Sequence, residues 1–209
     1  MTLGEVLVAS AITLTLMGTV IGMTTPLQRL FDTQPEYGDM HQRLRGAIDA
    51  LTRDLVGAAP PVMPYRAGIR RHDPGAGVFY RSDAITLVPA RWDPAASSHT
   101  YYLRTDPTNG VSHLMQYDGG ESDLPLADHI TRLEFAYFGE AGTPLAPELF
   151  QDGPWFPDDR DRYRFDLDLL RIRRVRVTLR VQAASPALRP FLPDQEVTFD
   201  VAPRNLNRE

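Results

Sequence analysis

The sequence predicts an α+β protein, in which a long and partly transmembrane N-terminal helix carries an antiparallel β-sheet head. Three observations lead to this class. An uncharged apolar run occupies residues 6–21, a helical apolar period follows over 40–55, and alternating strand-like segments take over beyond Pro61. The expected division is a stalk helix over 1–58 and a head over 59–209. Within the stalk, residues 1–27 form a transmembrane half and residues 36–58 an amphipathic half that packs on the head.

Composition narrows the classes of function that this chain can have. The 209 residues carry a net charge of -5, so the chain is not expected to bind nucleic acid through bulk charge. Cysteine is absent, which excludes disulfides, thiolate catalysis and metal sites with cysteine ligands. All 22 basic residues are arginine. Because the chain cannot form disulfides, the stability of the head must come from its hydrophobic core.

The N-terminal run reads VLVASAITLTLMGTVI from Val6 to Ile21, and apolar character continues to Leu27. About 20 such residues span a bilayer core. A secretory signal peptide needs a basic region ahead of its apolar core, and Arg29 is the first basic residue here. A plain membrane anchor accounts for the run. It gives no reason for Glu5, the one ionisable side chain at its entrance.

The first nine residues, MTLGEVLVA, resemble the mature N-terminus of type IV pilins and pseudopilins, whose pattern is F-[ST]-L-x-E-L-[LM]-[VI]-[AS]. Six positions match: Thr2, Leu3, Glu5, Leu7, Val8 and Ala9. Met1 stands where the family usually has Phe, and Gly4 where Ile or Val is commoner. The leader peptide of that family, which ends in Gly, is not in this sequence, so the numbering is expected to begin at the mature terminus.

The resemblance implies the pilin fold and two successive locations for the chain. The chain is expected to sit in the inner membrane as a single-pass protein before assembly, and in an extracellular or periplasmic filament afterwards. A prepilin peptidase and methylase would generate and methylate the amine of Met1. Glu5 would pair with that amine, either its own or that of an adjacent pilin subunit, because a carboxylate inside a membrane needs a partner. Met1 and Glu5 are the expected assembly residues.

Helix-breaking residues follow the apolar run. Gly18, Gly22 and Pro26 are expected to interrupt the stalk, with Pro35 and Gly38 as a second interruption. In pilins, similar breakers mark where the helix bends or unwinds within a filament. A simple loop at the membrane surface is the other interpretation.

Apolar residues then recur at spacings of three and four, which predicts one amphipathic helix that ends near Gly57 and lies on a sheet. These residues are Met40, Leu44, Ala47, Ile48, Leu51 and Leu55. Strands are expected over 84–88, 100–104, 111–117, 133–137, 174–183 and 196–201, with a turn over 106–110. The last two strands carry opposite charges on their polar faces, which predicts that they pair.

The order of head features resembles PilW-type minor pilins and the J-type pseudopilins of type II secretion. The matching segments are Leu133–Phe138, Ile172–Leu179 and Val201–Leu206. The chain is therefore expected to be a pilin or minor pilin. The alternatives are a type II secretion pseudopilin, or a membrane-tethered periplasmic binding module that does not polymerise.

Other candidate sites have plainer explanations. Asp158, Asp159 and Asp161 offer oxygen ligands for calcium, but interleaved arginines favour a self-neutralising loop, and no EF-hand spacing is present. The histidines show no metal spacing and no nucleophile motif occurs, so neither an enzyme nor a cofactor is expected.

Overall fold

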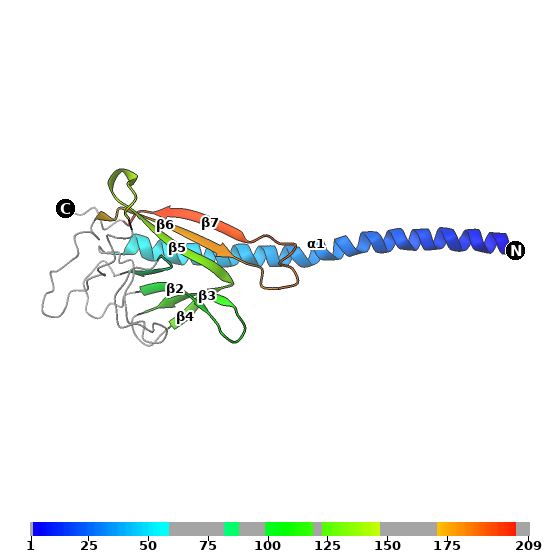
Figure 1. Cartoon of the computed structure of the whole chain (residues 1–209), viewed down its shortest axis with the longest axis horizontal. Coiled ribbons are helices and arrows are strands. Elements are labelled where there is room, and N and C mark those ends of the chain that lie inside the picture. Colours follow the sequence, from blue (N-terminus) through cyan, green and yellow to red (C-terminus); the bar gives the residue numbers. More distant parts are fainter. Residues whose placement is uncertain (1, 59–81, 88–98, 119–122, 147–170, 204–209) are drawn as a thin grey trace.

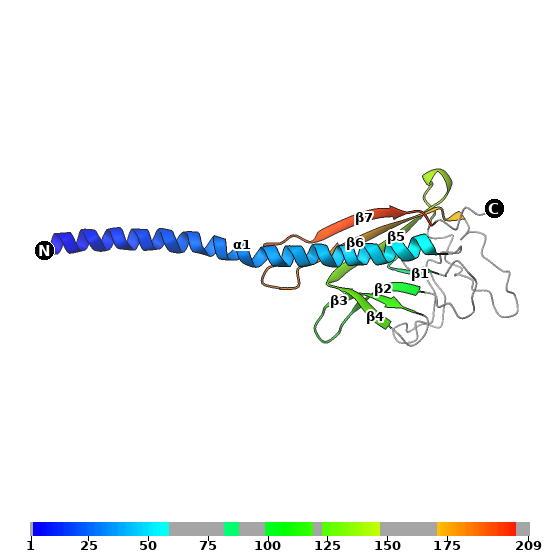
Figure 2. The same ribbon diagram turned by 180° about the vertical axis from the view of Figure 1, so that it is seen from behind.

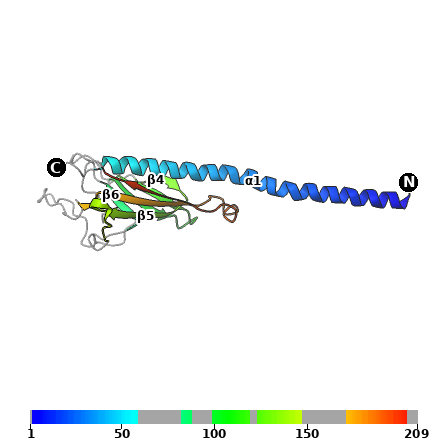
Figure 3. The ribbon, with the colours of Figure 1, turned by 90° about the horizontal axis from the view of Figure 1, so that it is seen from above.

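The computed structural model describes residues 2–58, 82–87, 99–118, 123–146 and 171–203. One helix, α1 (Leu3–Gly57), runs the length of the molecule, and its C-terminal part lies across two antiparallel sheets (Figures 1 and 2). The N-terminal half projects far beyond the head as a rod (Figure 3). The α+β class with a long N-terminal helix is confirmed.

The first sheet has the order β1-β2-β3-β4 and the second the order β5-β6-β7. The strands of the first sheet are β1 (Ala84–Leu87), β2 (His99–Thr105), β3 (Ser112–Tyr117) and β4 (Asp123–Asp128). The second sheet contains β5 (Ile130–Phe138), β6 (Arg174–Val181) and β7 (Gln195–Val201). A short 3₁₀ helix, η1 (Glu140–Gly142), follows β5.

The described part of the head contains two sheets where the sequence predicted one. The change of sheet occurs at His129, which separates β4 from β5 and has a positive φ of 59°. That backbone conformation is uncommon for a residue with a side chain, and it turns the strand sharply. The sheets remain linked, because the Phe135 backbone N–H donates to the Ser82 carbonyl at 2.7 Å.

Strand β4 was not predicted. Its sequence DLPLAD contains Pro125, which cannot donate a hydrogen bond to a neighbouring strand and argues against a central strand. β4 is an edge strand of its sheet, where a proline is tolerated, and its register with β3 shifts between Leu114 and Met115. A register shift of this kind disrupts the hydrogen bonds between the two strands locally.

The remaining strand predictions are confirmed to within a few residues. The expected turn joins β2 to β3, where the Gly110 N–H donates to the Asp106 carbonyl at 2.8 Å and Gly110 has a φ of 69°. The expected pairing of the last two strands is also present. Arg176 forms two hydrogen bonds with the Asp200 carboxylate, at 2.8 and 3.1 Å, and Arg180 pairs with Glu196.

The core forms between α1 and both sheets. The predicted apolar stripe of α1 is buried in it: Met40, Ala47, Leu51 and Leu55 are 0% exposed. The alternation of β6 places its four apolar side chains in the same core, namely Val175, Val177, Leu179 and Val181. The second half of the stalk is therefore part of the head, as predicted.

Candidate functional site

The candidate site is the N-terminal half of α1. Over Leu3–Thr24 the helix is long and apolar enough to cross a membrane, either as an anchor or as a signal sequence, and none of this segment is buried by the rest of the chain. Its 22 residues at ~1.5 Å each span about 33 Å, which matches a hydrocarbon core of about 30 Å. Such an exposed apolar surface requires a cover other than water.

The start of the helix is closed by a reciprocal capping box. The Thr2 backbone N–H donates to Oε2 of Glu5 at 2.8 Å, and the Glu5 backbone N–H donates to the Thr2 hydroxyl at 3.4 Å. Glu5 thus satisfies a backbone donor that lacks an intrahelical partner, and its charge lies at the positive end of the helix dipole. This gives the carboxylate a local role that even a plain anchor would use.

The capping role of Thr2 is the feature that the sequence interpretation missed. The spacing Thr2-x-x-Glu5 ahead of an apolar run is itself the signature of a capping box, and it was available in the sequence. Met1 lies outside the described residues, so the expected pairing of its amine with Glu5 stays a prediction. A carboxylate has two oxygens with several lone pairs. Capping and pairing are therefore compatible.

The polar side chains within the apolar segment return their hydrogen bonds to the helix. Hydroxyl groups donate to backbone carbonyls three or four residues earlier, at distances between 2.7 and 3.0 Å. The donors are Ser10, Thr13, Thr15, Thr19 and Thr24. In a bilayer core no water is present to satisfy these groups. The segment is thus suited to an apolar environment despite its five hydroxyls.

The expected interruption at Gly18, Gly22 and Pro26 is absent in this chain, because α1 is one helix from Leu3 to Gly57. Pro26 cannot donate to the carbonyl of Gly22, but one missing bond in a 55-residue helix leaves the flanking turns intact. Pro35 and Gly38 also lie within the helix. A bend of this region inside a filament stays a prediction.

Rigid contacts join the stalk to the head. Oδ2 of Asp54, near the end of α1, accepts a hydrogen bond from the Tyr101 hydroxyl at 2.6 Å and lies 2.8 Å from Nδ1 of His99. Burial, reinforced by this carboxylate, raises the pKa of Tyr101 well above its usual range. Nearer the N-terminus, the Ala184 backbone N–H donates to Glu36 at 2.6 Å. The helix is thereby fixed to the sheets at both ends of the head.

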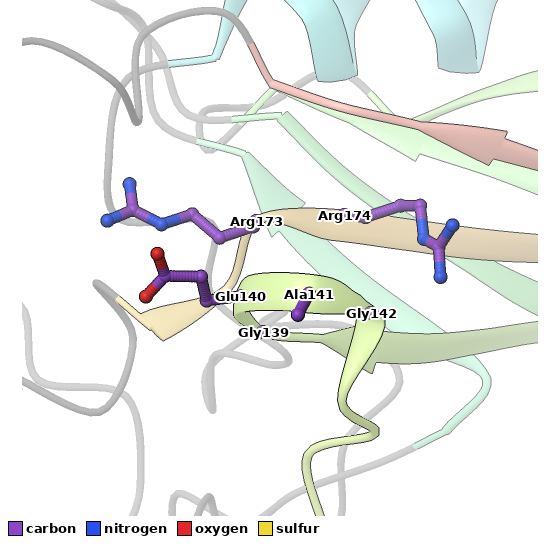
Figure 4. Close-up of a pocket in the computed structure, with 6 residues that line it drawn as sticks. All are labelled: Gly139, Glu140, Ala141, Gly142, Arg173 and Arg174. Carbon is purple, nitrogen blue, oxygen red and sulfur yellow. The ribbon is translucent and has the colours of Figure 1, made fainter.

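A hollow of about 430 Å³ lies beside η1 (Figure 4). Figure 4 shows Arg173 and Glu140 projecting on one side of it and Arg174 pointing away. The Arg174 guanidinium lies 4.8 Å from the centre of the Phe138 ring and 3.5 Å from Asp200, so it has structural partners. One carboxylate and two guanidinium groups do not form a nucleophile with its base.

The remaining candidates are the aspartates and histidines considered as metal ligands. The calcium candidates Asp158, Asp159 and Asp161 lie outside the described residues. Among the residues that the structure does describe, no group of three or more His, Asp or Glu side chains is arranged to hold a metal ion. His99 pairs with Asp54 and His113 with Asp128, and in the described part of the chain neither histidine contacts a second carboxylate.

Comparison with models of known protein families and with curated proteins finds no match to this chain.

Proposed function

We propose that this chain is a structural subunit, a pilin or minor pilin, of a type IV pilus-like filament that polymerises through its N-terminal helix. The observation that carries the proposal is the Leu3–Thr24 segment. It is apolar, it is uncovered by the rest of the chain, and it continues the same helix that forms the core of the head. Glu5, its only charge, stands in the first turn.

Two environments suit this segment in turn. Before assembly the inner membrane covers it, and after assembly the equivalent helices of neighbouring subunits do so, because both bury apolar surface. A charged Glu5 is costly in either environment unless a cation is near. The amine of Met1, made by a prepilin peptidase and methylated by the same machinery, supplies that cation in our proposal.

The head then acts as a structural and recognition unit rather than as an enzyme. Its described polar clusters hold the fold together: Asp54 joins α1 to β2, and Arg176 joins β6 to β7. Nucleic acid is not a proposed partner of this acidic chain.

Two alternatives share part of this argument. A type II secretion pseudopilin would use the same helix and the same carboxylate in a shorter periplasmic filament. A membrane-tethered periplasmic binding module would need the helix only as an anchor, and the length and composition of Leu3–Thr24 suit that role as well.

An exchange of the anchor separates the filament subunit from the tether. Residues 3–24 are replaced by an unrelated apolar transmembrane helix of equal length, and the chain is followed in membrane and sheared-filament fractions. A filament subunit should stay in the membrane with a folded head and disappear from the sheared fraction. If the wild-type chain never enters the sheared fraction, or the exchanged chain enters it equally well, the filament proposal is wrong and the tether replaces it.

A further inference from the structure

Three segments meet at the base of the head, by which we mean the end from which α1 emerges towards the N-terminus. They are α1 itself, the corner at His129 and the β6–β7 loop, residues 182–194. The Gln182 N–H donates to the His129 carbonyl at 3.0 Å. The Ala184 N–H donates to Oε1 of Glu36 at 2.6 Å. Two hydrogen bonds thus join the loop to the corner on one side and to α1 on the other, where Figures 1 and 2 show the loop running beside the helix.

The side chain of His129 is partly buried at this junction, where charged groups from all three segments act on it. Two are cations, Arg43 of α1 and Arg189 of the loop, and two are carboxylates, Glu36 of α1 and Asp128 of β4. Nε of Arg189 donates to the Ala183 carbonyl at 3.1 Å, which fixes that cation on the loop. Burial, reinforced by the Arg43 guanidinium, lowers the pKa of His129. The imidazole is therefore uncharged at neutral pH.

Both carboxylates already have partners other than His129. Oδ1 of Asp128 lies 2.7 Å from Nδ1 of His113. Oε1 of Glu36 lies 3.5 Å from Nη1 of Arg43. That nitrogen of Arg43 is buried and, within the described part of the chain, makes no hydrogen bond. The positive charge at the junction is thus incompletely compensated while His129 is neutral, so a further partly buried cation is unfavourable there.

We propose that His129, the β6–β7 loop and Glu36 of α1 form an acid-sensitive latch at the base of the head. While His129 is neutral, the three segments pack together. When it is protonated, the cost of burying its charge and the repulsion from Arg43 and Arg189 open the junction. The bond between Glu36 and the Ala184 N–H is then lost, and α1 gains freedom where it leaves the head. The response belongs to the range between about pH 7 and pH 5, because unperturbed histidine titrates near 6.5 and aspartate and glutamate near 4.

Amide hydrogen exchange of the full-length chain in detergent, corrected for the intrinsic pH dependence of exchange, measures the opening. In wild type the protection of the Ala184 amide should fall severalfold between about pH 7 and pH 5, and by no more than about tenfold per pH unit, because one proton is linked to the opening. His129→Asn stays uncharged, and asparagine tolerates a positive φ, so this variant should lose the pH dependence. His99→Gln is the matched control. His99 pairs with Asp54, about 27 Å farther along α1 than Glu36, so the wild-type response should remain.

Protection that does not change with pH in wild type would overturn the latch, and so would an equal acid response in wild type and His129→Asn. A response that is lost equally in His99→Gln would overturn it as well, because the opening would then not depend on His129 in particular. The imidazole NMR signals of His129 in the wild-type chain give a measurement that needs no variant. The pKa that they report should lie below that of a histidine in an unfolded peptide, and an ordinary or raised pKa would refute the latch.

Discussion

The substitution Glu5→Gln separates the two roles that the structure and the resemblance assign to this carboxylate. Glutamine has the shape of glutamate and still accepts a hydrogen bond, so the bond from the Thr2 N–H at 2.8 Å is preserved. The charge is lost. If Glu5 pairs with the amine of Met1 in the filament, Glu5→Gln leaves that ammonium group buried without a counter-charge.

The expected effect on assembly is large. Removing one partner of a buried ion pair shifts an equilibrium by more than about 100-fold, so Glu5→Gln should be depleted from filaments by that order. Thr2→Val is the matched control. It removes the bond from the Glu5 N–H, but that bond is missing equally in the membrane and in the filament. The distribution of Thr2→Val between the two should therefore change by no more than about threefold.

The assay compares a membrane fraction with a sheared-filament fraction for wild type, Glu5→Gln and Thr2→Val, with the head detected in each. All three should accumulate in the membrane. Wild-type levels of Glu5→Gln in filaments would refute charge pairing as the basis of subunit registration. A loss that is equally severe for Thr2→Val would show that the helix cap, and not the charge, is what assembly requires.

Four further outcomes are expected. Mass spectrometry of native protein should find Met1 N-methylated, and an unmodified, formylated or extended terminus would contradict leader processing. A filament map should show α1 bent or partly unwound between Gly18 and Pro26, whereas a straight helix there would refute the role given to the breakers. Leu51→Ala should lower the free energy of unfolding by about 2–5 kcal/mol, measured by urea titration in detergent, because its side chain is fully buried in the core between α1 and the sheets. The Arg176 hydrogen bonds lower the pKa of Asp200. Their contribution to stability is therefore complete above the unfolded pKa of the aspartate and is lost as pH falls through the lower folded value. Arg176→Gln should remove this contribution from the dependence of the free energy of unfolding on acid pH, and an unchanged dependence would contradict it.

Patterns that repeat along the chain predicted most of the head. The spacing of Met40, Ala47 and Leu51 identified the buried face of α1, because only one face of a helix meets a sheet. The alternation in β6 identified its core residues for the corresponding reason in a strand. Opposite charges on β6 and β7 correctly predicted their pairing, since cross-strand neighbours attract.

Features that depend on a single residue or on tertiary context were less predictable. The argument from the intrinsic propensity of proline failed at Pro26, which lies within a continuous helix. The corner at His129 gave no signal, since nothing local to a histidine indicates a positive φ. At the candidate site, Glu5 was identified through the resemblance, whereas the capping role of Thr2 was recognised from the hydrogen bonds, although its spacing from Glu5 already indicates it.

The unbroken helix also makes the length of its middle region critical. Because the membrane half and the head half are turns of one α1, each added residue between Thr24 and Met40 would advance the head by ~1.5 Å and rotate it by about 100° around the axis. Two chains of this type differing there by one residue would present different sides of their heads to the same neighbour. The number of residues between the apolar segment and the head therefore sets the rotation of the head about the helix axis, and insertions would be tolerated best near whole numbers of turns.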